Sequence, residues 1–232
     1  MFAGQHVEVR DEALPEEIGN RWRRQVGVDI LDGIGSTEML HIFISNQADD
    51  IRYGTSGKPV PGYAAMVVDE HDRPTPHSEP GELVVKGPSA ADGYWNQREK
   101  SRCTFRGEWT YTGDTYSRDA EGYFRFLGRR DEMLKVGGVW VSPFEVEEAL
   151  IAHPAVLEAA VVGKEDRDGL TKPRAFVVLK APETDLPALT ETLQEHVKQR
   201  VGVWKYPRWI EFVEGLPKTA TGKIQRFRLR DY

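Results

Sequence analysis

The pattern of apolar and turn-forming residues changes at Gly128, and this change constrains the possible folds more than any other feature. Between Gly54 and Gly128, short β-rich runs alternate with Gly, Pro and Asp. These runs cover 63–69, 82–86, 109–112 and 123–127. Their spacing predicts an antiparallel sheet or a small barrel, with one helical interruption over 96–104. Beyond Gly128, strands and helices alternate over about 100 residues, which predicts a small independent α/β domain.

The pattern beyond Gly128 also places individual elements. Gly137 and Gly138 stand between two apolar arms in 133–141, which is typical of a hairpin turn. The run Ser142-Pro143-Phe144-Glu145 supplies a cap, a first-turn proline and a capping-box acid for a helix over 144–152. Further strands are predicted over 157–162, 174–180 and 209–213, and a helix over 186–201.

The first 50 residues predict one helix and one short strand. Pro15 precedes two acids and an amphipathic run that ends at Val26, as expected at the start of a helix. The apolar run 28–30 predicts a short buried strand that leads into a glycine-containing loop over 32–38. The whole pattern therefore belongs to the α/β (α+β) class.

Composition excludes several classes of protein. The 31 Lys+Arg against 37 Asp+Glu give a net charge of −6, which disfavours a nucleic-acid partner. No run is long and apolar enough to span a membrane. The residues before Leu14 lack the basic and apolar regions of a signal peptide, so the expected location is cytoplasmic. Cys103 is the single cysteine, which excludes an internal disulfide and predicts a buried small hydrophobe.

Two short segments in the first half carry candidate chemistry. In Gly35-Ser36-Thr37-Glu38, backbone N–H groups and the Thr37 hydroxyl suit a phosphate, and Glu38 suits a magnesium ion. The same triplet Ser-Thr-Glu is more often a helix cap, which is the preferred interpretation on the residues alone. In Thr112-Gly113-Asp114, the carboxylate suits a ribose diol. On the residues alone, an ordinary β-turn is the preferred interpretation there.

Two further segments lie in the second half. The run 128–138 combines arginines, Asp131 and a Gly-Gly turn, and it is either a ligand-contacting junction or a charged linker with an ordinary hairpin. The run 217–224 is not a Walker loop because its glycine spacing is wrong and Ile224 follows Lys223. Lys223 is therefore either a mobile point charge near a ligand or a solvated lysine. Spacing alone favours a core position for His41.

These segments occur in an order that resembles the C-terminal portion of the adenylate-forming superfamily. The stretches GSTE, TGD, GRRDEMLKVGG, SPFEVE and PKTATGKIQR carry the resemblance, which runs from about Leu14 to the end. The stretch LDGIGSTEMLHIFISN is most similar to benzoate-CoA ligases and related aryl-CoA ligases. The resemblance implies the end of a large adenylating domain with an antiparallel β-barrel-like subdomain, followed by a small α/β lid domain. The implied boundaries are 1–127 (a remnant over 1–50 and a β-rich subdomain over 51–127) and 128–232, with a hinge near 128–131.

The resemblance implies an ATP-dependent acid-thiol ligase that adenylates an aryl carboxylate and transfers it to coenzyme A. It also implies residue roles. ATP or AMP would be held by Gly35, Ser36, Thr37, Asp114 and Arg129, and Mg²⁺ by Glu38. The catalytic lysine would be Lys223, the hinge Asp131, the CoA tunnel Gly137 and Gly138, and the aryl pocket His41 and Ile42. A pocket role for His41 replaces the core position that spacing favours.

The 232 residues contain no Thr/Ser/Gly-rich loop of the type TSGTTGxPK, which wraps the outer phosphates in this superfamily. We therefore expect that they do not form a competent ligase alone. One alternative is a noncatalytic fragment that binds nucleotide or CoA weakly. Another is an adenylating module that loads a carrier protein. A polypeptide that supplies the missing N-terminal half, or self-association, is a further expected interaction.

Overall fold

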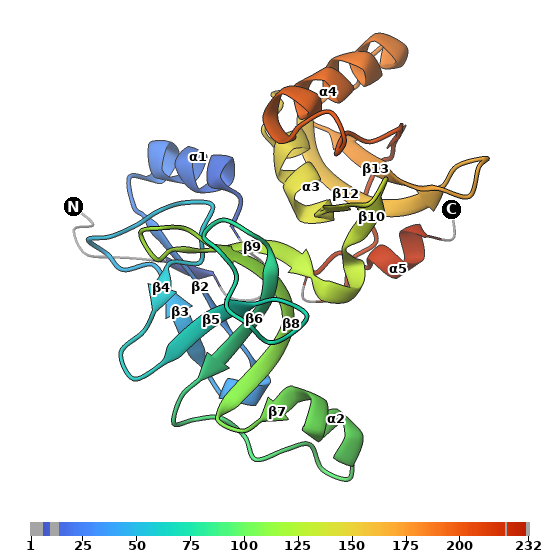
Figure 1. Cartoon of the computed structure of the whole chain (residues 1–232). Helices are drawn as coiled ribbons and strands as arrows, with labels where there is room; N and C mark the ends of the chain where they lie inside the picture. Colours follow the sequence, from blue (N-terminus) through green and yellow to red (C-terminus); the bar gives the residue numbers. More distant parts are fainter. Residues whose placement is uncertain (1–6, 10–13, 221, 231–232) are drawn as a thin grey trace. The chain divides into compact units, whose positions relative to one another are not determined.

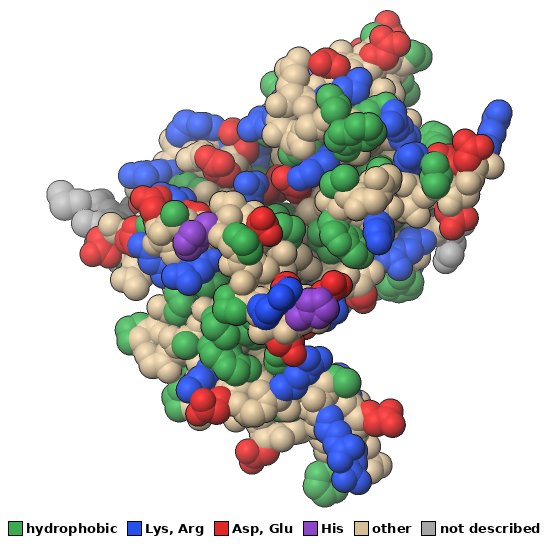
Figure 2. Space-filling view, in the orientation of Figure 1, with side chains coloured by type: hydrophobic (Ala, Val, Ile, Leu, Met, Phe, Trp, Pro, Cys, Tyr) green, Lys and Arg blue, Asp and Glu red, His purple; other side chains and the backbone are tan. Residues whose placement is uncertain are grey.

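The chain forms two compact units, Met1–Arg130 and Asp131–Tyr232. The computed structural model in Figure 1 describes residues 7–9, 14–220 and 222–230. None of the helices in this part of the chain has the length and apolarity that a bilayer span requires. On the face drawn in Figure 2, basic and acidic side chains are interspersed, in keeping with a net charge of −6.

The first unit begins with a four-stranded sheet and one helix. Helix α1 covers Glu16–Val26 and confirms the predicted helix. The sheet has the order β1-β2-β3-β4, in which β1 and β2 are parallel and the other neighbours antiparallel. Its strands are β1 (Val7–Val9), β2 (Ile30–Gly35), β3 (Ile42–Ser45) and β4 (Lys58–Pro59).

The predicted strand over 28–30 is wrong, because β2 extends from Ile30 through most of the predicted loop. Gly33 and Gly35 signal a loop in the sequence, but here they allow two strands to approach closely. A Cβ on Gly33 would lie 2.8 Å from the Ile44 carbonyl oxygen, and one on Gly35 would lie 2.6 Å from that of His41. Glycine in this strand therefore serves packing against β3 rather than a turn.

The second sheet of this unit confirms the predicted antiparallel arrangement. It has the order β5-β6-β8-β7, and β9 pairs with β8. Its strands are β5 (Ala64–Val68), β6 (Gly81–Lys86), β7 (Phe105–Arg106), β8 (Trp109–Arg118) and β9 (Phe124–Arg129). Helix α2 (Arg98–Thr104) confirms the predicted interruption. It carries Cys103, whose side chain is exposed, so the predicted burial is wrong.

The two sheets of the first unit share one apolar core. Its fully or nearly buried members come from both sheets: Met39, Phe43, Ile44, Val67, Leu83, Val85, Tyr116 and Phe124. The one hydroxyl in this set, on Tyr116, pairs with Ser56 Oγ at 3.1 Å. Burial raises the pKa of Tyr116 well above its ordinary value, so the phenol stays neutral.

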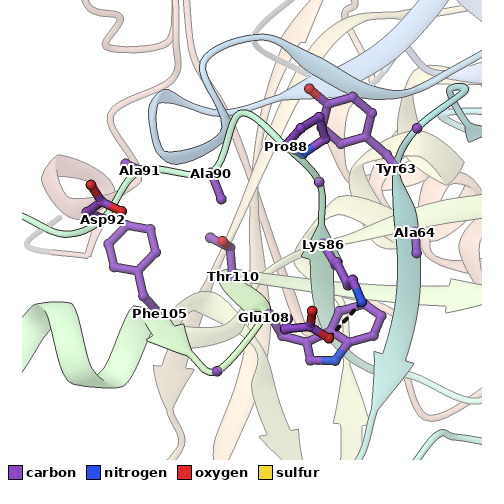
Figure 3. A pocket seen from close by; sticks show the side chains of 14 residues that line it. Tyr63, Ala64, Lys86, Pro88, Ala90, Ala91, Asp92, Phe105, Glu108 and Thr110 are labelled. Atoms are coloured by element: carbon purple, nitrogen blue, oxygen red, sulfur yellow. Dashed lines mark hydrogen bonds and ion pairs between the residues drawn. The ribbon is translucent and has the colours of Figure 1, made fainter.

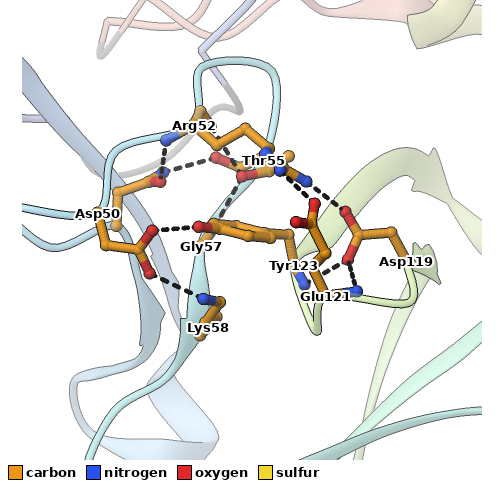
Figure 4. A network of polar contacts seen from close by, with 9 residues as sticks. Asp50, Arg52, Thr55, Gly57, Lys58, Asp119, Glu121 and Tyr123 are labelled. Carbon is orange, nitrogen blue, oxygen red and sulfur yellow. Dashed lines mark hydrogen bonds and ion pairs between the residues drawn. The ribbon is translucent and has the colours of Figure 1, made fainter.

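A polar network joins the segment before β4 to the turn between β8 and β9 (Figure 4). Asp50 accepts a hydrogen bond from Lys58 Nζ at 2.8 Å and another from the Tyr123 hydroxyl. The Arg52 guanidinium lies 4.0 Å from the centre of the Tyr123 ring and pairs with Asp119 at 2.7 Å. The network fixes a loop whose backbone also pairs with β9 through Gly57.

Asp32 on β2 is buried and predicts a pH-dependent stability. Burial raises the pKa of this carboxyl to about 6, although the backbone N–H groups of Leu14 and Gly33 donate to it. The folded state therefore holds a proton that the unfolded chain has released. Stability should fall as the pH rises from about 4 to 7, by about 3 kcal/mol for a shift of two units.

The matched variant Asp32→Asn isolates this contribution, because an amide of the same shape does not titrate. Urea unfolding at pH 4.5 and at pH 7.5 gives the difference in unfolding free energy between variant and wild type. We expect that difference to move in favour of the variant as the pH rises. An equal difference at both pH values would show that Asp32 has an ordinary pKa.

The second unit begins with a turn and a hairpin. The short 3-10 helix η2 covers Arg130–Glu132. Strands β10 (Leu134–Val136) and β11 (Val139–Val141) pair antiparallel around Gly137 and Gly138, which confirms the predicted hairpin. Helix α3 (Pro143–Ile151) follows, and its cap Ser142 accepts the Glu145 N–H at 2.9 Å, as predicted from the capping sequence.

A three-stranded sheet forms the centre of the second unit, in the order β12-β13-β14. Its strands are β12 (Val156–Glu165), β13 (Thr171–Leu179) and β14 (Trp209–Phe212), and the helices are α4 (Leu186–Val201) and α5 (Arg226–Leu229). Helices α3 and α4 pack on one face around Val161 and Val177. The C-terminal segment packs on the other face around Val162 and Phe176. Both faces of β12 are thus covered, so it reads as a continuous apolar run.

Candidate functional site

The segment Gly35-Ser36-Thr37-Glu38 lies where β2 ends and a short 3-10 helix, η1 (Thr37–Met39), begins. Ser36 caps this helix, since its Oγ accepts the Met39 N–H at 3.3 Å. The cap interpretation is therefore confirmed for Ser36. Thr37 is exposed and Glu38 is half-buried, so both side chains are available at the surface beside the end of the strand.

Thr112-Gly113-Asp114 forms a bulge inside β8, and the β-turn preferred from the sequence is wrong. The register against β6 shifts between Glu82 and Val84, so that these three residues of β8 lie opposite the single residue Leu83 of β6. Gly113 has a φ of +74°, which favours glycine, and Thr112 Oγ1 donates to the Leu83 carbonyl at 3.0 Å. The bulge directs Asp114 toward β9, where it faces Arg129.

Asp114 and Arg129 form an ion pair beside Glu38 and Tyr94. Arg129 Nη1 lies 2.7 Å from Asp114 Oδ1 and also donates to the Thr112 carbonyl at 3.3 Å. The Tyr94 hydroxyl donates to Glu38 Oε1 at 2.5 Å. The charge of Glu38 acts to raise the pKa of Asp114, and the charge of Arg129 acts to lower that of Tyr94, so the four side chains form one electrostatic cluster. We call these four residues the carboxylate cluster.

The two carboxylates of the cluster have opposite pKa shifts. Burial raises the pKa of Asp114, and the nearby charge of Glu38 adds to this effect, whereas Arg129 opposes it. Burial also acts to raise the pKa of Glu38, but hydrogen bonds, first of all from Tyr94, hold it below its usual value. Glu38 is therefore the more readily ionised group, as a cation ligand must be.

His41 is exposed, so the core position favoured by its spacing is wrong. Its Nε2 lies 2.6 Å from the Tyr63 hydroxyl, and the two rings meet edge to face with centres 5.2 Å apart. Ser89 Oγ continues the chain of bonds, from Tyr63 to the Met39 carbonyl. His41 is thus held at a fixed place at the surface, and the following residue, Ile42, begins β3 half-buried.

An open cavity of about 800 Å³ lies in the first unit (Figure 3), and none of the four residues of the carboxylate cluster lines it. Tyr63, which holds His41, forms part of its wall. Phe105 and Trp109 add aromatic surface, and Lys86 and Glu108, which form an ion pair with N and O 2.7 Å apart, also line the cavity. The cavity is built by the second sheet of the first unit.

The predicted lid residues all lie in the second unit. Asp131 is exposed within η2, and Gly137 and Gly138 form the exposed tip of the hairpin with φ of +56° and +87°. A Cβ on either glycine would meet nothing within 4 Å in this unit. The two glycines are therefore required by the backbone conformation of the turn and not by crowding within the unit.

Lys223 lies on a tight turn that the sequence motif builds from its own backbone. The Thr219 N–H donates to the Lys223 carbonyl at 2.8 Å, and the Lys223 N–H donates to Thr219 Oγ1 at 3.0 Å. The Gln225 N–H donates to the Pro217 carbonyl at 2.8 Å and so closes the turn. Lys223 is exposed, whereas Thr221 lies outside the described residues. The turn presents the lysine at the surface of the unit.

Two residues that sequence reasoning missed fix this turn to the unit. Arg226 makes two hydrogen bonds to the buried carboxylate of Glu147, Nε to Oε1 at 3.1 Å and Nη2 to Oε2 at 2.8 Å. Glu147 lies on α3, within the SPFEVE stretch, where its neighbour Glu145 is the capping acid. The sequence did contain a signal for this pair. An arginine follows Lys223 by three residues, and α3 carries a second acid, Glu147, in addition to the acid Glu145 of the capping box.

The sequence matches the profile of the AMP-binding enzyme family over residues 5–95 and that of the AMP-binding enzyme C-terminal domain over residues 145–223. The chain belongs to the adenylate-forming superfamily. It corresponds to the C-terminal portion of these enzymes and is most similar to their aryl-CoA ligases. The structure has the fold expected for that portion of the superfamily.

Individual adenylate-forming relatives are similar over almost the whole chain. The benzoate–CoA ligase of Thauera aromatica is 61% identical over 220 residues, which are 94% of this chain and 42% of that relative. The 4-hydroxybenzoate–CoA/benzoate–CoA ligase of Rhodopseudomonas palustris is 52% identical over 95% of this chain and 41% of its own length. The chain therefore spans about two fifths of the curated relatives that it matches.

Solved structures of adenylate-forming enzymes agree with this assignment. The anthranilate CoA ligase AuaEII, in complex with anthranoyl-AMP, superposes with a TM-score of 0.92 at 52% identity. A benzoate CoA ligase from Burkholderia xenovorans superposes with a TM-score of 0.90 at 56% identity. Each comparison covers 97% of this chain and 44% or 45% of the solved chain.

The site residues predicted for this adenylate-forming chain fall into two groups, one in each unit. In the first unit the fold brings Glu38, Asp114 and Arg129 together, and adds Tyr94, which no motif had indicated. In the second unit, Asp131, Lys223 and the Gly137-Gly138 tip lie on three separate exposed segments. Their roles, and the predicted domains 1–127 and 128–232, stay predictions.

Proposed function

We propose that this chain is the C-terminal part of an ATP-dependent aryl-CoA ligase of the benzoate type. The carboxylate cluster is the observation that carries the proposal. A β-bulge, a strand end, a 3-10 helix and a loop together supply two acids, a guanidinium and a phenol. The identity of 61% to a benzoate–CoA ligase supports the aryl acid as substrate.

In the first half-reaction, an oxygen of the aryl carboxylate attacks the α-phosphorus of ATP, and pyrophosphate leaves. Asp114 and Arg129 would hold the ribose hydroxyls, since the carboxylate accepts and the guanidinium donates. The Thr37 hydroxyl and the N–H groups after Gly35 and Ser36 would hold the α-phosphate. Glu38 fits a magnesium site, because such sites often combine one carboxylate with substrate phosphates, and the ion would neutralise phosphate charge.

Lys223 would bring its ammonium between the two anions that must approach each other. Carboxylate and phosphate repel, and a positive charge placed between them lowers the barrier most where water is excluded. An exposed lysine on a tight, self-bonded turn suits a group that enters a site and leaves it. Asp131 in the turn η2 would be the hinge for that movement.

In the second half-reaction, the CoA sulfur attacks the acyl carbon of the adenylate, and AMP leaves. The turn at Gly137 and Gly138 would line the path of the pantetheine chain, where the absence of Cβ atoms leaves room. His41 and Ile42 would line the aryl pocket. The bond from Tyr63 to His41 Nε2 supports this, because a fixed histidine can define one wall of a pocket.

We infer further that the 232 residues alone do not catalyse the reaction, because the loop for the outer phosphates is missing from them. Losing one preorganised donor commonly costs about 10²–10³ in rate, so losing the loop should cost more. The residues of that loop would then have to come from outside these 232, because a second copy of the same sequence lacks them too.

Benzoate-dependent ATP–pyrophosphate exchange tests the proposal. The chain is assayed alone, and together with the N-terminal half of the Thauera benzoate–CoA ligase. Exchange that appears only on complementation supports both inferences. Exchange by the chain alone overturns the inference of incompetence. No exchange in either sample, with both proteins folded, supports a noncatalytic fragment, and transfer to a carrier protein in place of CoA would indicate a loading module.

Ionisation of Asp114 should control nucleotide affinity. Only the ionised carboxylate of Asp114 accepts charge-assisted hydrogen bonds from both ribose hydroxyls. Burial raises the pKa of this group, so it becomes protonated at a higher pH than an ordinary aspartate. AMP affinity should therefore decrease as the pH is lowered into the acid range, and the decrease should begin at a higher pH than for an aspartate with an ordinary pKa. Loss of one charge-assisted bond corresponds to about tenfold or more in affinity. Calorimetric titration with AMP over a series of pH values measures this decrease. Asp114→Asn should bind AMP weakly throughout the series, and an unchanged pH dependence in this variant would contradict the prediction.

A further inference from the structure

Arg226 anchors the segment that carries Lys223, and the proposed reaction assigns it no role. It is the first residue of α5, and its side chain is only 19% exposed. Its Nε and Nη2 both donate to the carboxylate of Glu147, whose side chain is 5% exposed. Glu147 Oε1 also accepts the backbone N–H of Val161 at 2.7 Å. The carboxylate is therefore held by β12 on one side and by Arg226 on the other.

Arg226 also reaches the turn that contains Asp131. Its Nη1 lies 3.7 Å from Glu132 Oε2, and Glu132 is the last residue of η2. A single guanidinium thus connects the segment after Lys223, helix α3 and the turn η2. The three residues that meet here, Arg226, Glu147 and Glu132, all belong to the second unit.

The apolar contacts of this segment lie on both sides of the exposed residues of the Lys223 turn. Leu216 before the turn and Leu229 after it are buried against Ala160 and Phe176. Between them, residues 218–223 are exposed wherever they are described. Lys218 is tied to Glu158 at 2.6 Å on one side, and Arg226 is tied to Glu147 on the other. Of these two contacts the one made by Arg226 is the buried one, since the side chains of Arg226 and Glu147 are 19% and 5% exposed and those of Lys218 and Glu158 37% and 36%.

We propose that Arg226 is a positioning residue for Lys223. By binding Glu147 on α3 and Glu132 in η2, it keeps the segment that carries Lys223, helix α3 and the hinge turn together as one rigid body. Two hydrogen bonds from one planar guanidinium fix both the orientation of the Arg226 side chain and its distance from Glu147. A lysine at this position cannot form such a two-bond contact. Positioning matters here because a displacement of about 1 Å at a reacting group costs about 10²-fold in rate. This inference rests on the proposed function only for the role of Lys223.

Hydrogen exchange of the chain tests the anchor without any activity. In Arg226→Met, peptides covering 216–225 and 128–134 should exchange about tenfold faster, whereas peptides of β12 should change little. Arg226→Lys should give an intermediate increase. The matched control is Arg228→Met, two residues further on α5 and exposed, which should exchange as the wild type. Unchanged exchange of both peptides in a folded Arg226→Met chain overturns the proposal.

Activity of the complemented ligase tests the positioning itself. Arg226→Met and Glu147→Gln should lower the kcat of ATP–pyrophosphate exchange by about 30-fold or more, with little change in the KM for ATP, and Arg226→Lys should recover part of it. Conversion of preformed benzoyl-adenylate by CoA should stay near the wild-type rate. An equal loss in both half-reactions overturns the positioning role. If the wild type itself shows no exchange, the proposed function fails, and hydrogen exchange still decides whether Arg226 anchors the turn.

Discussion

Lys223→Ala is expected to lower benzoate-dependent ATP–pyrophosphate exchange of the complemented ligase by about 10²–10³-fold, the usual cost of one preorganised charge or donor. The turn around Lys223 is closed by backbone groups and by Thr219 Oγ1, so the substitution leaves these bonds in place. The loss should therefore reflect the missing ammonium and not a collapsed turn. Reaction of preformed benzoyl-adenylate with CoA should be nearly unaffected, because that step no longer opposes two anions.

Lys218→Ala is the matched control for Lys223→Ala. Lys218 lies in the same turn and carries the same charge, but its ammonium pairs with Glu158 at 2.6 Å. A ligase with this substitution should keep most of its exchange activity. Similar losses in the two variants would mean that the general charge of the turn matters, and full activity of Lys223→Ala would remove Lys223 from the reaction.

Gly57→Ala should destabilise the first unit more than other single substitutions of a glycine in its loops. Gly57 has a φ of +89°, and a Cβ there would overlap backbone atoms of Ser45 and Asn46. Its carbonyl accepts the Phe124 N–H at 2.9 Å, so the strand cannot move away without breaking that bond. The neighbouring network around Arg52 and Tyr123 holds the same loop (Figure 4). We expect a loss of about 3 kcal/mol or more.

Gly62→Ala separates this overlap from the cost of the backbone conformation. Gly62 has a φ of +90°, almost the same as Gly57, but nothing lies within 4 Å of a Cβ built on it. Alanine should cost only about 1 kcal/mol there. Thermal unfolding measures both variants, and the expected losses correspond to a decrease of about 10 °C in Tm for Gly57→Ala and about 3 °C for Gly62→Ala. Equal decreases in Tm for the two variants would show that β3 shifts to make room for the added methyl group at position 57.

Sequence reasoning was most successful where a few neighbouring residues decide the local structure. Ser142, Pro143 and Glu145 predict the start of α3, and Gly137-Gly138 predicts the hairpin, because capping bonds and turn dihedrals depend only on residues close in the chain. Helix α4 is predicted with the same limits that the structure shows, 186–201. Its apolar spacing and first-turn proline are also local signals.

Predictions failed where a distant strand changes the meaning of a local signal. Glycines at 33 and 35 indicate a loop when read alone, yet they lie in β2 because β3 approaches too closely for a side chain. Gly113 indicates a turn, yet it forms a bulge because β6 continues past it on one side and β9 pairs on the other. The exposed places of His41 and Cys103 depend on contacts that spacing does not contain.

The candidate site shows the same division. Glu38, Asp114, Arg129 and Lys223 were predicted from short motifs whose order resembles a known family, although each motif alone left another interpretation open. Tyr94 and Tyr63 were not found, since each acts through a hydrogen bond to a residue far away in the chain. Arg226 and Glu147 were missed for the same reason, being 79 positions apart.

The sequence by itself determined the class of the fold, most helices and hairpins, the family, and the residue types that carry the proposed chemistry. All of these follow from local periodicity, from capping and turn residues, or from ordered motifs. Only the tertiary structure decided that Glu38 and Asp114 share one cluster, that Arg226 holds the Lys223 turn, and that Asp32 is buried with a raised pKa. Such properties depend on distance and on exclusion of water, which arise only when segments remote in the chain pack together.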